Sequence, residues 1–483
     1  MHFSIVAKIV GVLLMLFSLL ANLPSILISV IYQEQEHGSF LAALLVTFFT
    51  GFILWGSTFR TKEALRTRDG FLIVTLFWTV LGTFGALPFF FSNALPLSVT
   101  DAVFESISGL TTTGSTVVTG LETLPKSILF YRQQLQWLGG MGIVALAVAV
   151  LPMLGIGGMQ LYRAESPGPV KNDNLVPRLA ETAKALWYIY LGLTVACAMA
   201  YWAAGMSLFD AICHSFSTVA IGGFSTYDAS MGHFDSHLIN LIAVFFMVLA
   251  GINFALHFTA WRSRGVGQYI RDPETMFYAG ILVFVSSVSI VVLYSTGTYG
   301  ATDAFVNGLF QSVSIATTTG FAVTDYNAWP FALPYLLFYA AIIGACAGST
   351  GGGMKVIRIL LIFKQGIREV RRLIHPNSVI SIKVGKKLVP DRVIESVWGF
   401  FSVYVLVYLL LLLALLASGM DVLTAFSAVG ATLNNLGPGL EGVAANFAEL
   451  SNYAKWVLCL AMLLGRLEIF TLLVLFMPMF WRR

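Results

Sequence analysis

The chain has 483 residues, of which 57% are hydrophobic and 11% are charged. Soluble domains carry about 25% charged residues, so this composition excludes a soluble protein. A mean hydropathy of +0.82 over this length indicates many membrane spans, and a formal net charge of only +4 gives no sign of nucleic-acid binding.

Ten apolar stretches are long enough to cross a bilayer, for which a helix needs about 20 residues. The first is too long for the hydrophobic region of a signal peptide and has no clear cleavage site, so we expect a retained helix. The ten stretches cover residues 5–31, 39–58, 71–93, 130–155, 185–205, 235–260, 274–297, 331–363, 395–418 and 452–480.

Four shorter apolar segments lie between these spans, and each is followed by Gly and polar residues. They are too short to cross the membrane, so we expect them to enter it, turn, and leave on the same side. They cover residues 101–113, 210–222, 303–319 and 421–436.

Lys and Arg are concentrated in alternate connecting segments, which marks the cytoplasmic side. The opposite segments 206–234 and 298–330 contain neither residue, and 94–127 contains only Lys126. We therefore expect both termini inside and the four short segments dipping in from outside. The basic residues lie in 59–69, in 156–184, at Arg262, Arg264 and Arg271, in 364–392, and at Arg482 and Arg483.

The four short segments align without gaps on the glycine that ends each of them. Three copies share one serine column at Ser106, Ser215 and Ser312, and a second one two residues later. The fourth copy shares neither column and is the most diverged. Such self-similarity indicates an internal repeat. The aligned segments are DAVFESISGLTTTG (101–114), DAICHSFSTVAIGG (210–223), NGLFQSVSIATTTG (307–320) and TAFSAVGATLNNLG (424–437).

Each short segment has one span before it and one after it. The sequence therefore predicts an all-α integral membrane protein, with two N-terminal helices and four helix–re-entrant pore loop–helix repeats around a central pore. The predicted parts are the two N-terminal helices (1–68), repeat one (69–165), repeat two (166–268), repeat three with an intramembrane Gly-rich loop (269–375) and repeat four (376–483).

Four re-entrant loops at one level would form a selectivity filter. Rings of backbone carbonyls can replace the hydration shell of a monovalent cation, and the closing glycine adopts backbone angles that are closed to other residues. The alternative is four ordinary helix C-caps, but four copies at one depth favour the filter. The predicted ion-binding residues are Thr111, Thr112, Thr113, Gly114, Ala220, Ile221, Gly222, Gly223, Thr317, Thr318, Thr319, Gly320, Asn434, Asn435, Leu436 and Gly437.

The strips TTTGST, AIGGFST, ATTTGFA and NNLGPGL, with CAGSTGGGMKVIR and GRLEIFTLLVLF, resemble the Trk/Ktr/HKT superfamily of potassium transporters along the whole chain. Within it, the resemblance is closest to the bacterial TrkH family. It implies a homodimer in the bacterial inner membrane, with potassium bound at the filter and no organic cofactor in this chain. It also implies low-affinity potassium uptake gated by a cytosolic nucleotide-binding ring (TrkA-like).

The four strips differ from one another and from the TVGYG strip of potassium channels. AIGG and NNLG contain no threonine. A filter with unlike walls is expected to coordinate ions less tightly than a fourfold-identical one, and so to discriminate less sharply against sodium.

The run 344–353 contains five glycines, and each costs about 1 kcal/mol in a helix interior relative to Ala. We expect this run to interrupt its helix, and we expect no other obvious broken helix. Because little side-chain packing would hold the run, we also expect it to be a movable gate below the filter. A phosphate-binding loop is excluded because Met354 follows Gly353. Arg466 is either a positive charge near the ion path or half of an interhelical salt bridge. The predicted gate residues are Gly344, Gly348, Ser349, Thr350, Gly351, Gly352, Gly353, Lys355 and Arg466.

Other polar groups give weaker indications. One repeat column contains Glu105, His214 and Gln311, with Ala428 in the fourth copy. We expect the polar members either to form hydrogen bonds behind the filter or to contact the ion directly. The four cysteines are far apart in apolar segments, so we expect no metal or redox site.

Three classes of function remain to be compared. A potassium-selective pore subunit fits the repeats best, and a sodium- or proton-coupled potassium symporter is the alternative. An enzyme needs a nucleophile within reach of a base, and the adjacent pair His214 and Ser215 would diverge on a helix. We therefore predict that the chain is not an enzyme.

Overall fold

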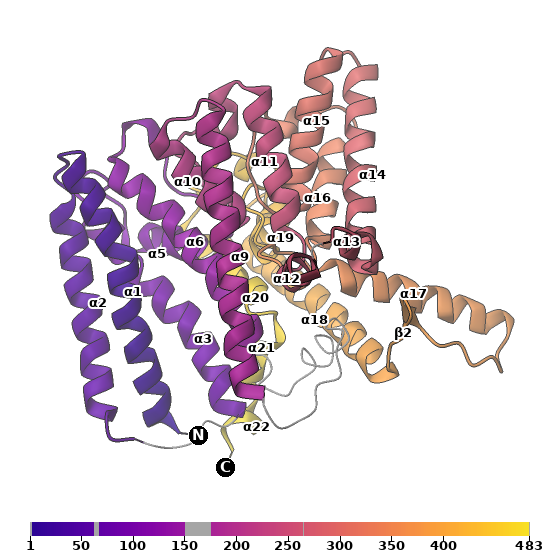
Figure 1. Ribbon diagram of the computed structural model, residues 1–483, viewed down its shortest axis with the longest axis horizontal. Helices are drawn as coiled ribbons and strands as arrows, with labels where there is room; N and C mark the ends of the chain where they lie inside the picture. Colours follow the sequence, from indigo (N-terminus) through magenta and orange to yellow (C-terminus); the bar gives the residue numbers. More distant parts are fainter. Residues whose placement is uncertain (1, 62–66, 150–174, 264, 483) are drawn as a thin grey trace.

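The computed structural model describes residues 2–61, 67–149, 175–263 and 265–482, and this part of the chain is almost entirely helical (Figure 1). A single antiparallel hairpin interrupts the helices, formed by β1 (Lys383–Val384) and β2 (Lys387–Leu388). In Figure 1 the chain crosses the molecule from α1–α3 on the left to α14–α16 on the right, and both termini lie at the lower end.

The two N-terminal helices, α1 (Phe3–Ile31) and α2 (His37–Thr58), pack against each other through glycines. A Cβ added to Gly11 would lie 2.7 Å from the carbonyl oxygen of Gly51, and a Cβ on Gly51 would lie 2.6 Å from the carbonyl oxygen of Gly11. Small residues allow such close backbone approach between membrane helices, where packing rather than the hydrophobic effect drives association.

Four units follow, each with a first helix, a short pore helix and a second helix. The four copies confirm the predicted fold class, although the chain limits of the repeats stay predictions and the limit at 165 lies outside the described residues. The units are α3 (Thr67–Phe84) with α4 (Leu87–Phe91), α5 (Val99–Leu110) and α6 (Lys126–Ala149); α9 (Leu175–Ala203), α10 (Leu208–Val219), α11 (His237–Ala250) and α12 (Phe254–Ser263); α14 (Pro273–Ser295), α15 (Ala301–Ala316), α16 (Leu333–Ile343) and α17 (Val356–Ile374); and α18 (Asp391–Leu416), α19 (Val422–Leu433), α20 (Asn452–Arg466) and α21 (Phe470–Phe476).

Short elements connect these helices. In the described part of the chain they comprise α13 (Gly267–Arg271) and four 3₁₀ turns, η1 (Leu121–Thr123), η2 (Ser230–Phe234), η3 (Tyr326–Ala328) and η4 (Glu441–Val443), and the short α22 (Pro478–Trp481) follows α21.

The units are joined in a closed cycle. The second helix of each unit packs on the pore helix of the next, α6 on α10, α11 on α15 and α20 on α5. Between units three and four, the ring of Phe338 on α16 lies 5.8 Å from that of Phe426 on α19. Because unit four returns to unit one, the four pore helices surround one axis.

The pore helices are 12, 12, 16 and 12 residues long, which is too short to span the bilayer. Three begin with a side-chain cap, at Ser98, Ser207 and Asp421. Their other ends stop in the buried centre of the molecule, so the negative ends of four helix dipoles point toward the axis.

The second helices are broken more often than the sequence indicates. α11 and α12 meet at 93° and α20 and α21 at 115°, in addition to the expected break between α16 and α17. The prediction of one obvious break was therefore wrong. At the first new break the amide of Phe254 donates to the carbonyl of Gly348 at 3.0 Å, a bond made only after the chain has folded.

Among the described residues, six helices are long and apolar enough to cross a membrane, or eight if each bent pair is one span. α6 and the α16–α17 pair occupy the two remaining predicted positions. Most of the predicted basic segment 156–184 lies outside the described residues.

Candidate functional site

All four predicted strips leave their pore helices by the same backbone path. The second strip residue is left-handed in each, with φ of 53° at Thr112, 53° at Ile221, 66° at Thr318 and 52° at Asn435. The closing glycines Gly114, Gly223, Gly320 and Gly437 also have positive φ, from 77° to 102°.

The hydrogen bonds of these turns are those of a helix C-cap. The third strip residue donates to a carbonyl five residues back, as from Thr113 to Ser108 at 2.9 Å and from Leu436 to Ala431 at 2.8 Å. This is the Schellman pattern, so the C-cap alternative describes the local geometry correctly. Its left-handed position is normally glycine, and a non-glycine residue there costs about 1–2 kcal/mol. Such strain persists only where surrounding structure enforces it.

The glycines join the four strips into one ring. A Cβ added to any of them would overlap with the carbonyl oxygen of the third strip residue in the next repeat. The contacts run from Gly114 to Gly222, from Gly223 to Thr319, from Gly320 to Leu436 and from Gly437 to Thr113. The cycle closes after four steps, so the strips surround a single axis at one level.

Polar side chains brace each strip from the side. The hydroxyls of Thr111 and Thr113 are 2.7 Å apart, and those of Thr317 and Thr319 are also 2.7 Å apart. The amide of Asn435 donates to the Thr113 hydroxyl at 2.9 Å and so links repeat four to repeat one.

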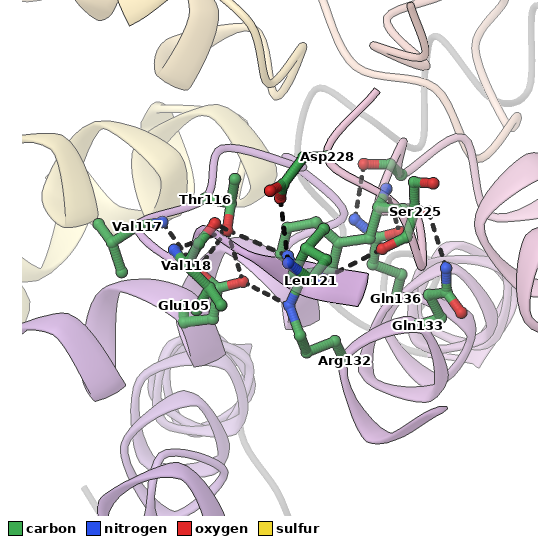
Figure 2. A network of polar contacts seen from close by, with 12 residues as sticks. Glu105, Thr116, Val117, Val118, Leu121, Arg132, Gln133, Gln136, Ser225 and Asp228 are labelled. Atoms are coloured by element: carbon green, nitrogen blue, oxygen red, sulfur yellow. Dashed lines mark hydrogen bonds and ion pairs between the residues drawn. The ribbon is translucent and has the colours of Figure 1, made fainter. Parts of the chain in front are cut away.

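A buried ion pair lies behind the first strip (Figure 2). Arg132 Nε on α6 donates to Glu105 Oε1 on α5 at 2.7 Å, and both side chains are almost completely buried. The same carboxylate accepts from the amide of Val117 at 3.0 Å and from the Thr116 hydroxyl, while Arg132 Nη1 reaches the carbonyl of Ser225 at 3.2 Å. The pair therefore fixes the chain after the first strip to the chain after the second.

The other members of this repeat column act similarly. His214 Nε2 bonds to the Ser225 hydroxyl at 3.0 Å. Gln311 contacts the backbone of Phe321 and Val323 at 3.5 and 3.4 Å. These side chains lie behind the strips and hold the chain that leaves them, and Ala428 has no polar group to do so.

Glycines of the second helices touch the ends of the pore helices. A Cβ on Gly139 of α6 would overlap with the carbonyl oxygen of Leu110, and one on Gly465 of α20 with that of Leu433. Leu110 and Leu433 occupy the same repeat column. The second helices therefore pass directly beneath the strips.

The loop between α16 and α17 reaches three repeats. Cys346 donates to the carbonyl of Gly251 at 3.0 Å in repeat two, and Gly352 donates to the Thr318 hydroxyl at 2.7 Å in repeat three. Gly353 donates to the carbonyl of Asn434 at 3.0 Å in repeat four. The expectation of a loop with little to hold it was therefore wrong, because backbone hydrogen bonds replace side-chain packing.

Arg466 forms a hydrogen bond to this loop and does not pair with any carboxylate that the structure describes. Its Nη1 donates to the carbonyl of Thr350 at 3.1 Å. Among the described residues its Nε and Nη2 have no hydrogen-bond partner, although the side chain is buried. Glu468 pairs instead with Arg358 at 2.6 Å, and Lys355 Nζ donates to the carbonyl of Gly351.

Sequence reasoning missed two residues on α6. Arg132 and Gln136 both contact the strips or the chain leaving them, and Gln136 Nε2 donates to the carbonyl of Gly222 at 2.6 Å. The available signal was the polar run 132–136 inside a predicted apolar span. An ionisable residue in such a span is by default a functional candidate.

The chain is similar to cation transport proteins. The family model described as "TrkH: Cation transport protein" matches residues 36–483. The Trk system potassium uptake protein TrkH of Halomonas elongata is 57% identical, and that of Escherichia coli K12 is 54% identical, each with all of both chains covered. The crystal structure of the potassium transporter TrkH from Vibrio parahaemolyticus superposes with a TM-score of 0.93 at 55% identity and covers both chains completely.

Breaking the buried ion pair should destabilise the protein strongly. We expect Glu105→Gln to cost about 3–5 kcal/mol, because it leaves the Arg132 guanidinium buried without its counter-charge. Thermal unfolding in detergent measures this as a lowered midpoint. Asp303→Asn is the control, because Asp303 is 54% exposed in its pair with His237 and should give no measurable shift. Equal shifts for the two variants would contradict the structural role of the pair.

Proposed function

Because this chain belongs to the TrkH family of cation transport proteins, we propose that it conducts potassium ions through one pore on the axis of its four repeats. Membership confirms the resemblance noted in the sequence, and the family is one of membrane transporters rather than enzymes. The observation that carries the proposal is the closed cycle of glycine-to-carbonyl contacts among the four strips. The similar proteins named above for potassium uptake or transport support the choice of ion.

The proposed filter consists of the sixteen residues of the four strips, from Thr111–Gly114 to Asn434–Gly437. Their carbonyls would replace the hydration shell of potassium. The C-terminal ends of four pore helices add negative potential at the same place. Because the side chains of the four strips differ, we propose weaker binding than in a fourfold-identical filter, as suits a low-affinity uptake system.

The proposed gate is the loop 344–353 together with Lys355 and Arg466. The loop is bonded to repeats two, three and four directly below the filter. Arg466 adds an incompletely paired positive charge there, which opposes a cation until the loop moves. The Arg358–Glu468 pair joins the start of α17 to the break between α20 and α21. A force on α17 would therefore reach the loop.

We propose that α17 and the following hairpin receive that force from a cytosolic nucleotide-binding ring. α17 carries Lys364, Arg368, Arg371 and Arg372, and in Figure 1 it projects from the helix bundle. We further propose a homodimer in the bacterial inner membrane with both termini in the cytoplasm. The termini lie at one end of the molecule, and the positive-inside rule supports that orientation.

A coupled symporter is the second candidate. Broken helices are typical of ion-coupled transporters, and the structure contains more of them than the sequence indicates. A symporter moves its ions in a fixed ratio, so its reversal potential depends on both gradients, whereas that of a potassium pore depends on potassium alone.

We expect the reversal potential in liposomes to follow the potassium gradient, to shift with an imposed sodium gradient only as far as the sodium permeability of the filter allows, and to ignore an imposed pH gradient. Changing Gly114, Gly223, Gly320 or Gly437 to Ser should lower the potassium-to-sodium preference about tenfold, which corresponds to about 1.4 kcal/mol, because the added Cβ overlaps with a carbonyl of the ring and displaces it. Gly280→Ser is the control, since nothing lies within 4 Å of a Cβ there. A reversal potential set by a fixed ratio of potassium to sodium or to protons would favour symport, and sensitivity at one glycine alone would exclude a shared filter.

Releasing the loop from Arg466 should raise resting flux and leave ion preference largely unchanged, because the bonds of Gly352 to Thr318 and of Gly353 to Asn434 stay in place. Arg466→Ala removes a charged hydrogen bond of about 1.5 kcal/mol, which shifts a closed–open equilibrium roughly tenfold. Glu468→Gln should act in the same direction by weakening the link to Arg358. Potassium flux into liposomes measures both, with Arg262→Ala on the exposed end of α12 as the control. Lost flux, or a change in preference as large as that of the glycine variants, would place the gate elsewhere.

A further inference from the structure

Repeat two lacks a side chain at the third position of its strip. Gly222 occupies the column that holds Thr113, Thr319 and Leu436 in the other repeats. The glycine is not required by its backbone, because Gly222 is not among the residues with positive φ. Something outside the strip must therefore exclude a side chain here.

Gln136 on α6 occupies that space. A Cβ added to Gly222 would lie 2.5 Å from Gln136 Oε1 and 2.8 Å from its Nε2. The side chain is completely buried, and both of its polar atoms bond to repeat two (Figure 2). Nε2 donates to the carbonyl of Gly222 at 2.6 Å, and Oε1 accepts from the amide of Phe224 at 3.1 Å.

The other strips are braced by polar side chains of their own. Repeats one and three have paired threonine hydroxyls. In repeat four the Asn434 Oδ1 accepts from the Tyr404 hydroxyl at 3.0 Å, and Asn435 donates to Thr113 and to the carbonyl of Met462. The strip of repeat two is Ala-Ile-Gly-Gly and has no polar side chain. α6 of the preceding repeat supplies the missing one.

We propose that Gln136 is a positioning residue that sets ion preference by fixing the Gly222 carbonyl. This rests on the proposed filter, because the Gly222 carbonyl is a member of the closed ring and faces Gly114. A carbonyl oxygen has two lone pairs, so the amide bond leaves one for a cation. Two successive glycines make this strip the most adaptable of the four. Without the amide donor, its carbonyl can move inward to fit a smaller ion.

Substitutions at Gln136 on α6 and at Gly222 in the strip of repeat two, made singly and together, test the role of Gln136. Gln136→Ala should lower the potassium-to-sodium permeability ratio roughly 3- to 10-fold, the range expected for one lost hydrogen bond. Gly222→Thr alone should lower both flux and the permeability ratio, because the new Cβ overlaps with the Gln136 amide and displaces it from the residue-222 carbonyl. The double variant Gln136→Ala/Gly222→Thr should regain flux, because the threonine then fills the vacated space, but its permeability ratio should stay as low as that of Gln136→Ala, because no donor replaces the lost amide.

The control is Gln134→Ala, two residues away on the same helix. Gln134 is also buried, but its Nε2 donates to the carbonyl of Leu20 on α1 at 2.8 Å. The Gln134→Ala variant should leave the permeability ratio unchanged, and adding it to Gly222→Thr should not restore flux. An unchanged ratio in Gln136→Ala, or equal rescue by both alanine variants, would overturn the proposal. If the ring variants Gly114→Ser and Gly320→Ser change the ratio in the same assay, the filter stands while the role of Gln136 fails. If they do not, the proposed function fails as well.

Discussion

The architecture depends on a contact that only glycine permits. At the end of each strip a glycine with positive φ lies against a carbonyl oxygen of the next repeat, so the four repeats meet at this level without side chains between them. The short pore helices must therefore end in the buried centre, and the second helices must pass beneath them. Gly139 and Gly465 make that passage possible, because a larger residue would meet the carbonyls of Leu110 and Leu433.

The four strips share one backbone conformation, but different side chains hold each of them in place. All four strips share one backbone path and one set of hydrogen bonds, but each is braced differently, by threonine pairs, by asparagines, or by Gln136 from a neighbouring helix. A residue other than glycine is strained in the left-handed conformation. Surrounding contacts are therefore needed to hold that conformation in every strip. One chain with four diverged repeats can supply a different brace to each, which four identical subunits could not do.

The sequence was sufficient for the features that repeat locally. The short pore helices and the closing glycines follow from segment length and from an ungapped register, and the structure has them within a few residues of their predicted positions. Features made by contacts between repeats could not be read in this way. Arg132 reaches the carbonyl of Ser225 across 93 residues, and Gln136 meets Gly222 across 86 residues. The break after Ala250 depends partly on the carbonyl of Gly348, and the carboxylate nearest Arg466 in sequence pairs with Arg358 instead.

The central claim is that four strips form one cation-binding ring. Anomalous diffraction from crystals grown in rubidium, a heavier substitute for potassium, tests it most directly. A ring of four strips should give a peak on the axis within coordination distance of carbonyls from all four strips, between Gly114, Gly223, Gly320 and Gly437. This peak should disappear in a variant with serine at one of these glycines. No peak at the ring, or a peak bound by the strips of only one or two repeats, would contradict the central claim.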